Sequence, residues 1–118
     1  MANVYKNIQA IINQAGTDVA MYTSPTATTS IIKTIRLFNT HSGDLDVTST
    51  VYDDSSATNF EWDKTNVVAD NHANLLTYNN LLILEAGDIL KMQTPTTDVI
   101  NMTAAVLQIT RPPEVTIT

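Results

Sequence analysis

The fold is decided by one stretch, Leu45-Asp46-Val47-Thr48-Ser49-Thr50-Val51-Tyr52-Asp53. Its apolar residues alternate with polar ones, so that Leu45, Val47 and Val51 share one side of an extended chain. The other side carries Asp46, Thr48, Thr50 and Tyr52. A repeat of two residues is that of a β-strand with one dry face. The stretch therefore predicts a strand in a sheet that is buried on one side.

Similar segments recur along the chain, separated by clusters of Gly, Pro, Asn, Asp and Ser. Residues 3–13 would also fit a short helix, but no segment keeps a capped helical repeat over ten residues. The candidate strands are residues 4–13, 18–23, 30–39, 45–53, 58–62, 81–85, 89–93 and 99–110, with weaker candidates at residues 66–69 and 73–78. Eight or nine short antiparallel strands in one domain predict an all-β fold, an antiparallel β-sandwich that is jelly-roll-like.

Two segments carry more specific expectations. Ala86-Gly87-Asp88 joins two apolar runs and predicts a tight hairpin, in which Gly87 takes a positive φ. Residues 99–110 are apolar on both faces, with Ile100, Met102, Ala104 and Val106 on one and Val99, Ala105, Leu107 and Ile109 on the other. Two apolar faces predict a central strand, or a face buried against a neighbouring subunit.

The chain has 118 residues, which suits a single domain. Arg111-Pro112-Pro113 ends the last strand, and the β-branched residues 114–118 continue beyond it. Two prolines stiffen this exit, and a short β-branched segment is suited to pair with another sheet edge. We therefore divide the chain into a β-sandwich domain, residues 1–110, and an extended C-terminal arm, residues 111–118. The alternative is a frayed terminus.

Charge and composition exclude several partners and chemistries. Six basic and twelve acidic residues give a net charge of −6, which does not suit a nucleic-acid backbone or an anionic membrane. There is no cysteine, hence no disulfide or thiolate metal site. Charged residues make up only 15%, while 19 Thr and 11 Asn supply a neutral, hydrogen-bonding surface. Such a surface suits permanent contact with other protein chains. The start of the chain shows no export signal, and its longest apolar runs are too short to cross a bilayer.

Metal ligands are few and widely spaced. His41 and His72 lie 31 positions apart in predicted turns, without the close histidine spacing of a metal site on strands. The aspartates of residues 44–46 and 53–54 resemble fragments of a calcium loop, but the closing Glu is missing. Asp commonly caps turns through its side-chain oxygen, and we expect that role here. No metal and no cofactor is predicted.

Catalytic groups form no motif. Glu61, Asp63 and Glu85 are the candidate acids of a hydrolase, but their spacing does not bring them together; Glu61 and Asp63 are expected to point outward beside an inward Phe60 or Trp62. A Ser-His-Asp triad stays open, because its members need not be adjacent in sequence. No nucleophile elbow or phosphate loop occurs, and there are only three glycines. We predict no catalytic residue and no enzyme activity.

Aromatic side chains offer two interpretations. They could form part of a sugar-binding platform, or they could be core and interface groups, which is commoner in small β-proteins. The set is Tyr5, Tyr22, Tyr52, Phe60, Trp62 and Tyr78.

Three stretches resemble those of small β-sandwich structural proteins of tailed-bacteriophage virions. The first is Tyr22-Thr23-Ser24-Pro25-Thr26-Ala27-Thr28-Thr29-Ser30-Ile31-Ile32-Lys33-Thr34-Ile35-Arg36, and the second is residues 47–56. The third is Leu82-Ile83-Leu84-Glu85-Ala86-Gly87-Asp88-Ile89-Leu90-Lys91, an apolar strand, a turn and another apolar strand. The likeness in the order of strands and turns extends over most of residues 4–109.

The resemblance implies a non-enzymatic role in the virion, most closely that of a capsid decoration (cement) protein. Such a protein binds the outer surface of the major capsid protein, often as a trimer, and reinforces the shell. Its partners would be the major capsid protein or other virion proteins, with further copies of the chain. From the sequence pattern we expect the interface to include Pro112, Pro113, Val115, Ile117, Tyr5, Leu107 and Ile109.

Two alternatives remain at this point. A tail, neck or baseplate accessory protein of the virion would share fold and composition, and copy number would separate it from a decoration protein. A carbohydrate-binding module would instead place exposed aromatics on one sheet face, and Trp62→Ala would abolish its glycan binding.

Overall fold

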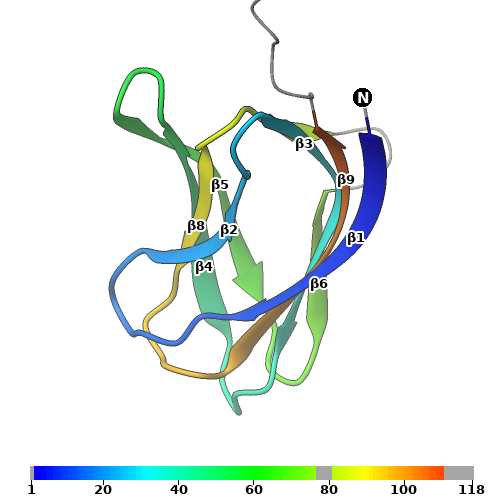
Figure 1. Ribbon diagram of the computed structural model, residues 1–118. Coiled ribbons are helices and arrows are strands. Elements are labelled where there is room, and N and C mark those ends of the chain that lie inside the picture. The colour runs from blue at the N-terminus through cyan, green and yellow to red at the C-terminus, as the bar shows by residue number, and fades with distance from the viewer. Residues whose placement is uncertain (1, 77–80, 111–118) are drawn as a thin grey trace, which may run out of the picture.

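The computed structural model describes residues 2–76 and 81–110 and is built from strands alone, which confirms the all-β class (Figure 1). The arm, residues 111–118, and Tyr78 lie outside the described residues. The described residues contain no helix long and apolar enough to span a membrane. The strands are β1 (Ala2–Ile11), β2 (Val19–Thr23), β3 (Thr28–Asn39), β4 (Leu45–Asp53), β5 (Thr58–Val67), β6 (His72–Leu76), β7 (Leu82–Leu84), β8 (Ile89–Gln93) and β9 (Ile100–Thr110).

Two antiparallel sheets pack face to face as a β-sandwich. The first sheet has the order β1-β9-β3-β6, with β7 also on β3, and the second has the order β2-β8-β4-β5. The chain forms one long antiparallel hairpin about the β4–β5 turn. In it β4 pairs with β5, β3 with β6, β2 with β8 and β1 with β9. Pairing of β3 with β9 and of β4 with β8 rolls that hairpin into two sheets. This is the strand order of a jelly roll, with β7 added.

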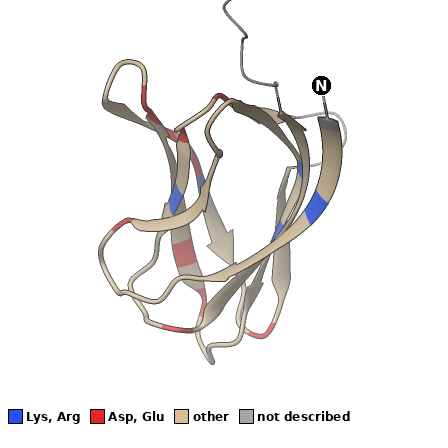
Figure 2. Ribbon diagram, in the orientation of Figure 1, with Lys and Arg blue, Asp and Glu red and all other residues tan. Residues whose placement is uncertain are grey.

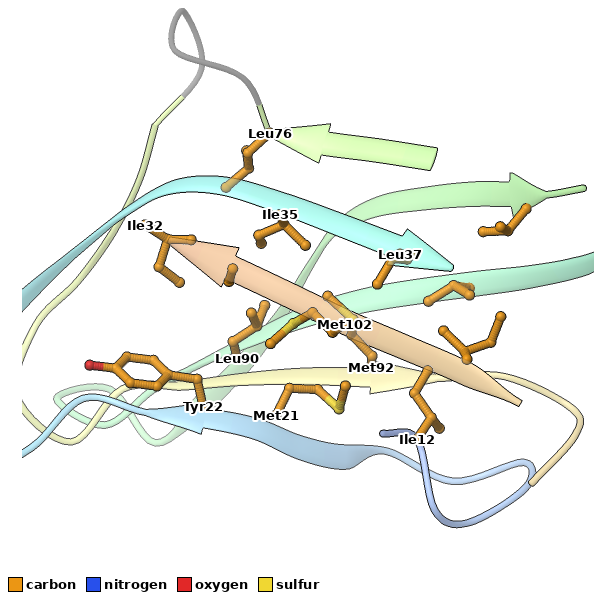
Figure 3. Close-up of a cluster of buried hydrophobic side chains, with 14 of the residues drawn as sticks. Ile12, Met21, Tyr22, Ile32, Ile35, Leu37, Leu76, Leu90, Met92 and Met102 are labelled. Atoms are coloured by element: carbon orange, nitrogen blue, oxygen red, sulfur yellow. The ribbon is translucent and has the colours of Figure 1, made fainter. Parts of the chain in front are cut away.

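The core fills the space between the sheets (Figure 3). Inward-facing aliphatic residues and the three methionines Met21, Met92 and Met102 meet there, because alternate residues of each strand point to opposite faces. The largest fully buried side chains are Ile12, Ile32, Ile35, Leu37, Val47, Val67, Leu84, Leu90, Met92, Ile100, Met102 and Val106.

The strands singled out by their alternation behave as predicted except at Thr50, which is predicted on the polar side of β4 and is buried. In β4, Leu45 and Val47 are buried and Val51 packs against the core, whereas Asp46 is exposed. In β9, buried residues alternate with half-buried or exposed ones, and the strand lies between β1 and β3. The central position predicted for this strand is therefore confirmed. Val99 differs, because it precedes β9 and packs against the core.

Two local predictions are wrong. Residues 58–62 and 66–69 were expected as separate strands, but β5 runs unbroken from Thr58 to Val67. A bulge at Trp62 shifts the alternation within β5, and this shift hides the continuity of the strand in the sequence. Residues 81–85 and 89–93 form no hairpin, because β7 pairs with β3 in the first sheet and β8 belongs to the second. Gly87 does have a positive φ, of 87°, in the turn that carries the chain between the sheets.

A buried polar network joins the two sheets at one end of the sandwich. Gln108 of β9 donates to the Tyr22 hydroxyl at 2.7 Å, and that hydroxyl lies 2.7 Å from the Ser30 hydroxyl. Ser24 continues the network to Ser30 at 2.9 Å and donates to the carbonyl of Thr28 at 3.0 Å. Because buried polar groups are costly unless paired, this network favours a single alignment of the two sheets.

Candidate functional site

An apolar row crosses the outer face of the first sheet. Tyr5 of β1 pairs with Leu107 of β9, Leu107 pairs with Ile31 of β3, and Ile31 pairs with Ile83 of β7. All four side chains point away from the core, since the neighbours Val106 and Ile32 point into it. Tyr5 is 71% exposed and Ile83 59% exposed, while Leu107 and Ile31 are half-buried. We call Tyr5, Leu107, Ile31 and Ile83 the apolar row.

Lys33 extends over the end of this row. It lies at a bulge in β3, and its ammonium nitrogen is 5.0 Å from the centre of the Tyr5 ring. A cation over an aromatic face is attracted by the negative charge of that face. The contact joins β3 to β1 above the intervening β9, so it holds the Tyr5 ring across the sheet.

The rest of the outer face carries mainly amide, hydroxyl and aliphatic groups, together with the exposed Arg36 of β3, which points outward between the buried Ile35 and Leu37. At the end of β1 opposite Tyr5 lies an open hollow of about 540 Å³, where Ile11 and Phe38 are both exposed. Its lining residues are Gln9, Ala10, Ile11, Phe38, Asn101, Met102 and Thr103. The outer face therefore offers hydrogen-bonding groups between the apolar row and this hollow. The residues that line the hollow include no ionisable group.

Charge is divided between the two sheets (Figure 2). Within the described ranges, the strands of the first sheet carry Lys6, Lys33 and Arg36 and no carboxylate. The strands of the second sheet carry four acids and two bases, and the remaining described acids lie in loops. The second-sheet set is Asp46, Asp53, Glu61, Asp63, Lys64 and Lys91. In a chain of net charge −6, the described strands of the first sheet therefore place no negative side chain on its outer face.

The structure brings together three of the seven predicted interface residues. Tyr5 and Leu107 are cross-strand partners, and Ile109 lies two residues further along the same face of β9. Pro112, Pro113, Val115 and Ile117 lie outside the described residues. Sequence reasoning missed Ile31 and Ile83. The signal was present, since each belongs to an apolar run in which both faces of a strand are apolar, as in residues 99–110.

The aspartates of β4 and its flanking loops serve turns and strand ends. Asp44 accepts a hydrogen bond from the backbone of Ala69 at 3.0 Å, and Asp46 accepts one from the Asn66 side chain at 2.8 Å. These two aspartates and Asp53 lie at opposite ends of β4 and therefore do not converge.

Asp53 and Asp88 organise the turns at the other end of the strand. The side-chain hydrogen bond from Ser55, 2.7 Å long, holds the pKa of Asp53 below its usual value. Its ionised form therefore favours the turn above the ordinary aspartate pKa, and this contribution is lost as the pH falls. Asp88 accepts hydrogen bonds from the backbone of Asp54 at 3.0 Å and of Glu85 at 2.9 Å, which links two loops.

The other candidate groups lie apart. His41 accepts a hydrogen bond from the Gly43 backbone at 3.0 Å. His72 is the first residue of β6, so the prediction that it lies in a turn is wrong. Within the described ranges, no three His, Asp or Glu side chains gather where they could hold a metal ion. Glu61 and Asp63 lie on β5, while Glu85 lies in the loop that precedes β8.

Aromatic side chains share no common face among the described residues. Tyr22 is in the core, and Trp62 packs against the core. Tyr52 lies on the second sheet, where the Lys91 ammonium is 5.0 Å from the centre of the Tyr52 ring. Tyr5 and Phe60 are exposed on different sheets. A Trp62→Ala variant would therefore disturb the packing of the core, so it would not isolate a sugar contact.

Comparison with protein-family models, curated proteins and solved structures finds no match for this chain.

Proposed function

We propose that the chain is a non-enzymatic structural protein of a tailed-bacteriophage virion, a capsid decoration protein that binds the outer surface of the shell. One observation carries the proposal: the outer face of the first sheet combines the apolar row with amide and hydroxyl groups and the cations Lys33 and Arg36, and its described residues include no carboxylate. Charge depletion around aromatic and aliphatic groups is typical of the central part of a protein interface. No carboxylate on the described part of this face would lose its water against another protein chain, and of the charged residues Arg is the one enriched in such interfaces.

The charge distribution also suggests an orientation. With the outer face of the first sheet on the shell, the acids of β4, β5 and the loops would face solvent or neighbouring copies. A net negative outer surface keeps particles apart and soluble. The proposed partners are the major capsid protein and two further copies of this chain, in accordance with the virion resemblance of residues 22–36, 47–56 and 82–91.

Copy number tests the location. We expect hundreds of copies of the chain in each purified virion, measured by quantitative mass spectrometry against the major capsid protein. A handful of copies, in multiples of three or six, would contradict the capsid role and place the protein in the neck, tail or baseplate. Absence from the particle would overturn the virion role altogether.

The variant Ile83→Asp tests whether the outer face of the first sheet is the contact surface. An aspartate at this exposed end of the apolar row should lower binding of the purified protein to undecorated capsids by about tenfold or more, because an unpaired carboxylate would lose water in the interface. Thr48→Asp adds the same charge on the outer side of the second sheet and should bind as the wild type does. Binding is measured by co-sedimentation with capsids. Equal binding by both variants and the wild type would show that the first sheet is not the contact face.

A further inference from the structure

β1 is an edge strand whose only protection of the usual kinds is Lys6, on the core side of the strand. It pairs with β9 over ten consecutive residues with no shift in register, and its other side has no strand partner among the described residues. The other edge strands are interrupted: β2, β5 and β6 each contain a bulge, and β7 has three residues. Soluble proteins normally blunt an exposed edge with bulges, prolines or short strands, because a regular edge recruits further strands. The edge of β1 is therefore suited to receive a strand.

The side chains along this edge define what kind of strand would fit. On the outer side, Tyr5 ends the apolar row and is open to solvent. On the opposite side, Lys6 is exposed although its partner Val106 is buried, and no acid lies on the neighbouring strand β9. The Lys6 side also carries Val4, which is 43% exposed, but Tyr5, at 71%, is the most exposed apolar group of this edge. A strand with an aliphatic residue on the Tyr5 side and a carboxylate on the Lys6 side would match that group and the single charged residue of β1.

Residues 114–118 of this chain have that pattern. Glu114, Thr116 and Thr118 alternate with Val115 and Ile117. If Val115 and Ile117 lie beside Tyr5, the two-residue repeat of a strand puts Glu114 on the side of Lys6. One placement of the segment thus puts aliphatic side chains beside Tyr5 and a carboxylate beside Lys6. We propose that residues 114–118 of one copy add as a strand to the free edge of β1 in a second copy.

The link to β9 favours a second copy over the same molecule. Thr110 pairs with Ala2 of β1 and Thr28 of β3, so β9 is flanked on both sides where it ends. To reach the free edge of its own β1, the chain would have to cross about 10 Å of sheet and reverse within residues 111–113. Pro112-Pro113 favours an extended path of about 3 Å per residue over such a reversal.

The contact joins two different surfaces, the segment 114–118 and the edge of β1, so copies would be linked head to tail. Such a contact closes into a ring when the rotation allows it, and we expect a ring of three copies. Direct pairing of two β1 edges is disfavoured, because an antiparallel alignment brings two Lys6 side chains together near its centre. This inference concerns the contact between copies and holds whether or not the protein binds a capsid.

Sedimentation of the full-length chain tests the proposal. We expect a concentration-dependent trimer for the wild type. Ile117→Asp should weaken association by about tenfold or more, because a carboxylate would then lie beside the apolar row. Thr116→Asp, one residue away and on the Lys6 side, is the matched control and should associate at least as well as the wild type. A monomeric wild type, or equal loss in both variants, would overturn the proposal.

Charge reversal in mixed samples shows whether the strand comes from another copy. Lys6→Glu and Glu114→Lys should each weaken association by about two- to fivefold, the effect expected of an exposed ion pair. An equimolar mixture should recover part of this loss, because the tail of Glu114→Lys fits the β1 edge of Lys6→Glu. No recovery on mixing would contradict an exchange between copies. A monomeric chain present at hundreds of copies per virion would remove this contact and leave the capsid role intact.

Discussion

Val47→Asp is expected to leave the chain without a folded state at neutral pH. Val47 has no exposed surface and lies in the middle of β4, where it pairs with Thr65 of β5. A carboxylate there would lose its water between the two sheets, without a partner among the buried side chains around it. The cost of burying an unpaired charge is several kcal/mol, a large part of the roughly 5–15 kcal/mol that stabilises a domain. Circular dichroism and one-dimensional NMR should show no cooperative unfolding and no dispersed methyl signals.

Thr48→Asp is the control for this prediction. It adds the same side chain one residue later in β4, on the opposite side of the strand. Thr48 is half-buried outside the core. We expect the variant to fold and to unfold within about 1 kcal/mol of the wild type, as substitutions away from the core usually do. If Val47→Asp instead unfolded at the wild-type urea concentration, the assignment of the two faces of β4 would be wrong.

Asn39→Asp is expected to destabilise the domain by about 3 kcal/mol or more, although the two side chains have nearly the same shape. The Asn39 amide nitrogen donates to the carbonyls of Gly43 at 2.9 Å and Val67 at 3.0 Å, and its oxygen accepts from the His41 backbone at 2.8 Å. The side chain is fully buried at the end of β3. An aspartate keeps the acceptor but turns a charged oxygen toward two carbonyl oxygens. Each buried group left unpaired costs about 1–3 kcal/mol, and the charge adds to this.

Urea unfolding measures this loss, and its pH dependence identifies the cause. Asn39→Asp should recover part of its stability at low pH, since a protonated acid can donate one of the two missing hydrogen bonds. Asn101→Asp, on the exposed side of β9, is the matched control and should lie within about 1 kcal/mol of the wild type. A loss for Asn39→Asp that did not change with pH would point to a change of shape rather than to the reversed donors.

The sequence predicted features that depend on near neighbours along the chain. The alternation of Leu45, Asp46 and Val47 reports directly which side of a strand loses water, because successive side chains point to opposite faces. The two apolar faces of residues 99–110 likewise predicted a strand that lies between two others, as β9 lies between β1 and β3. The positive φ of Gly87 followed from the turn chemistry alone.

Features that depend on distant partners were misread or missed. The turn at residues 86–88 has hairpin chemistry, yet its two strands join different sheets, because β3 and β4 supply the partners for β7 and β8. The strand β5 was divided in two, since its bulge at Trp62 breaks the local repeat while pairing with β4 continues across it. A local signal can mark a turn or a break, but it does not name the strand that pairs beyond it.

The candidate interaction face shows the same division. The sequence by itself determined an all-β chain of short antiparallel strands, a central final strand, and Tyr5 and Leu107 as surface apolar residues, because each follows from composition and the two-residue repeat. Only the tertiary structure decided that Tyr5, Leu107, Ile31 and Ile83 form one row. It also decided that the described strands of their sheet carry no acid, and that β1 is the edge strand without a bulge. Those properties arise from register and strand order, which are set by the packing of two sheets against a shared core.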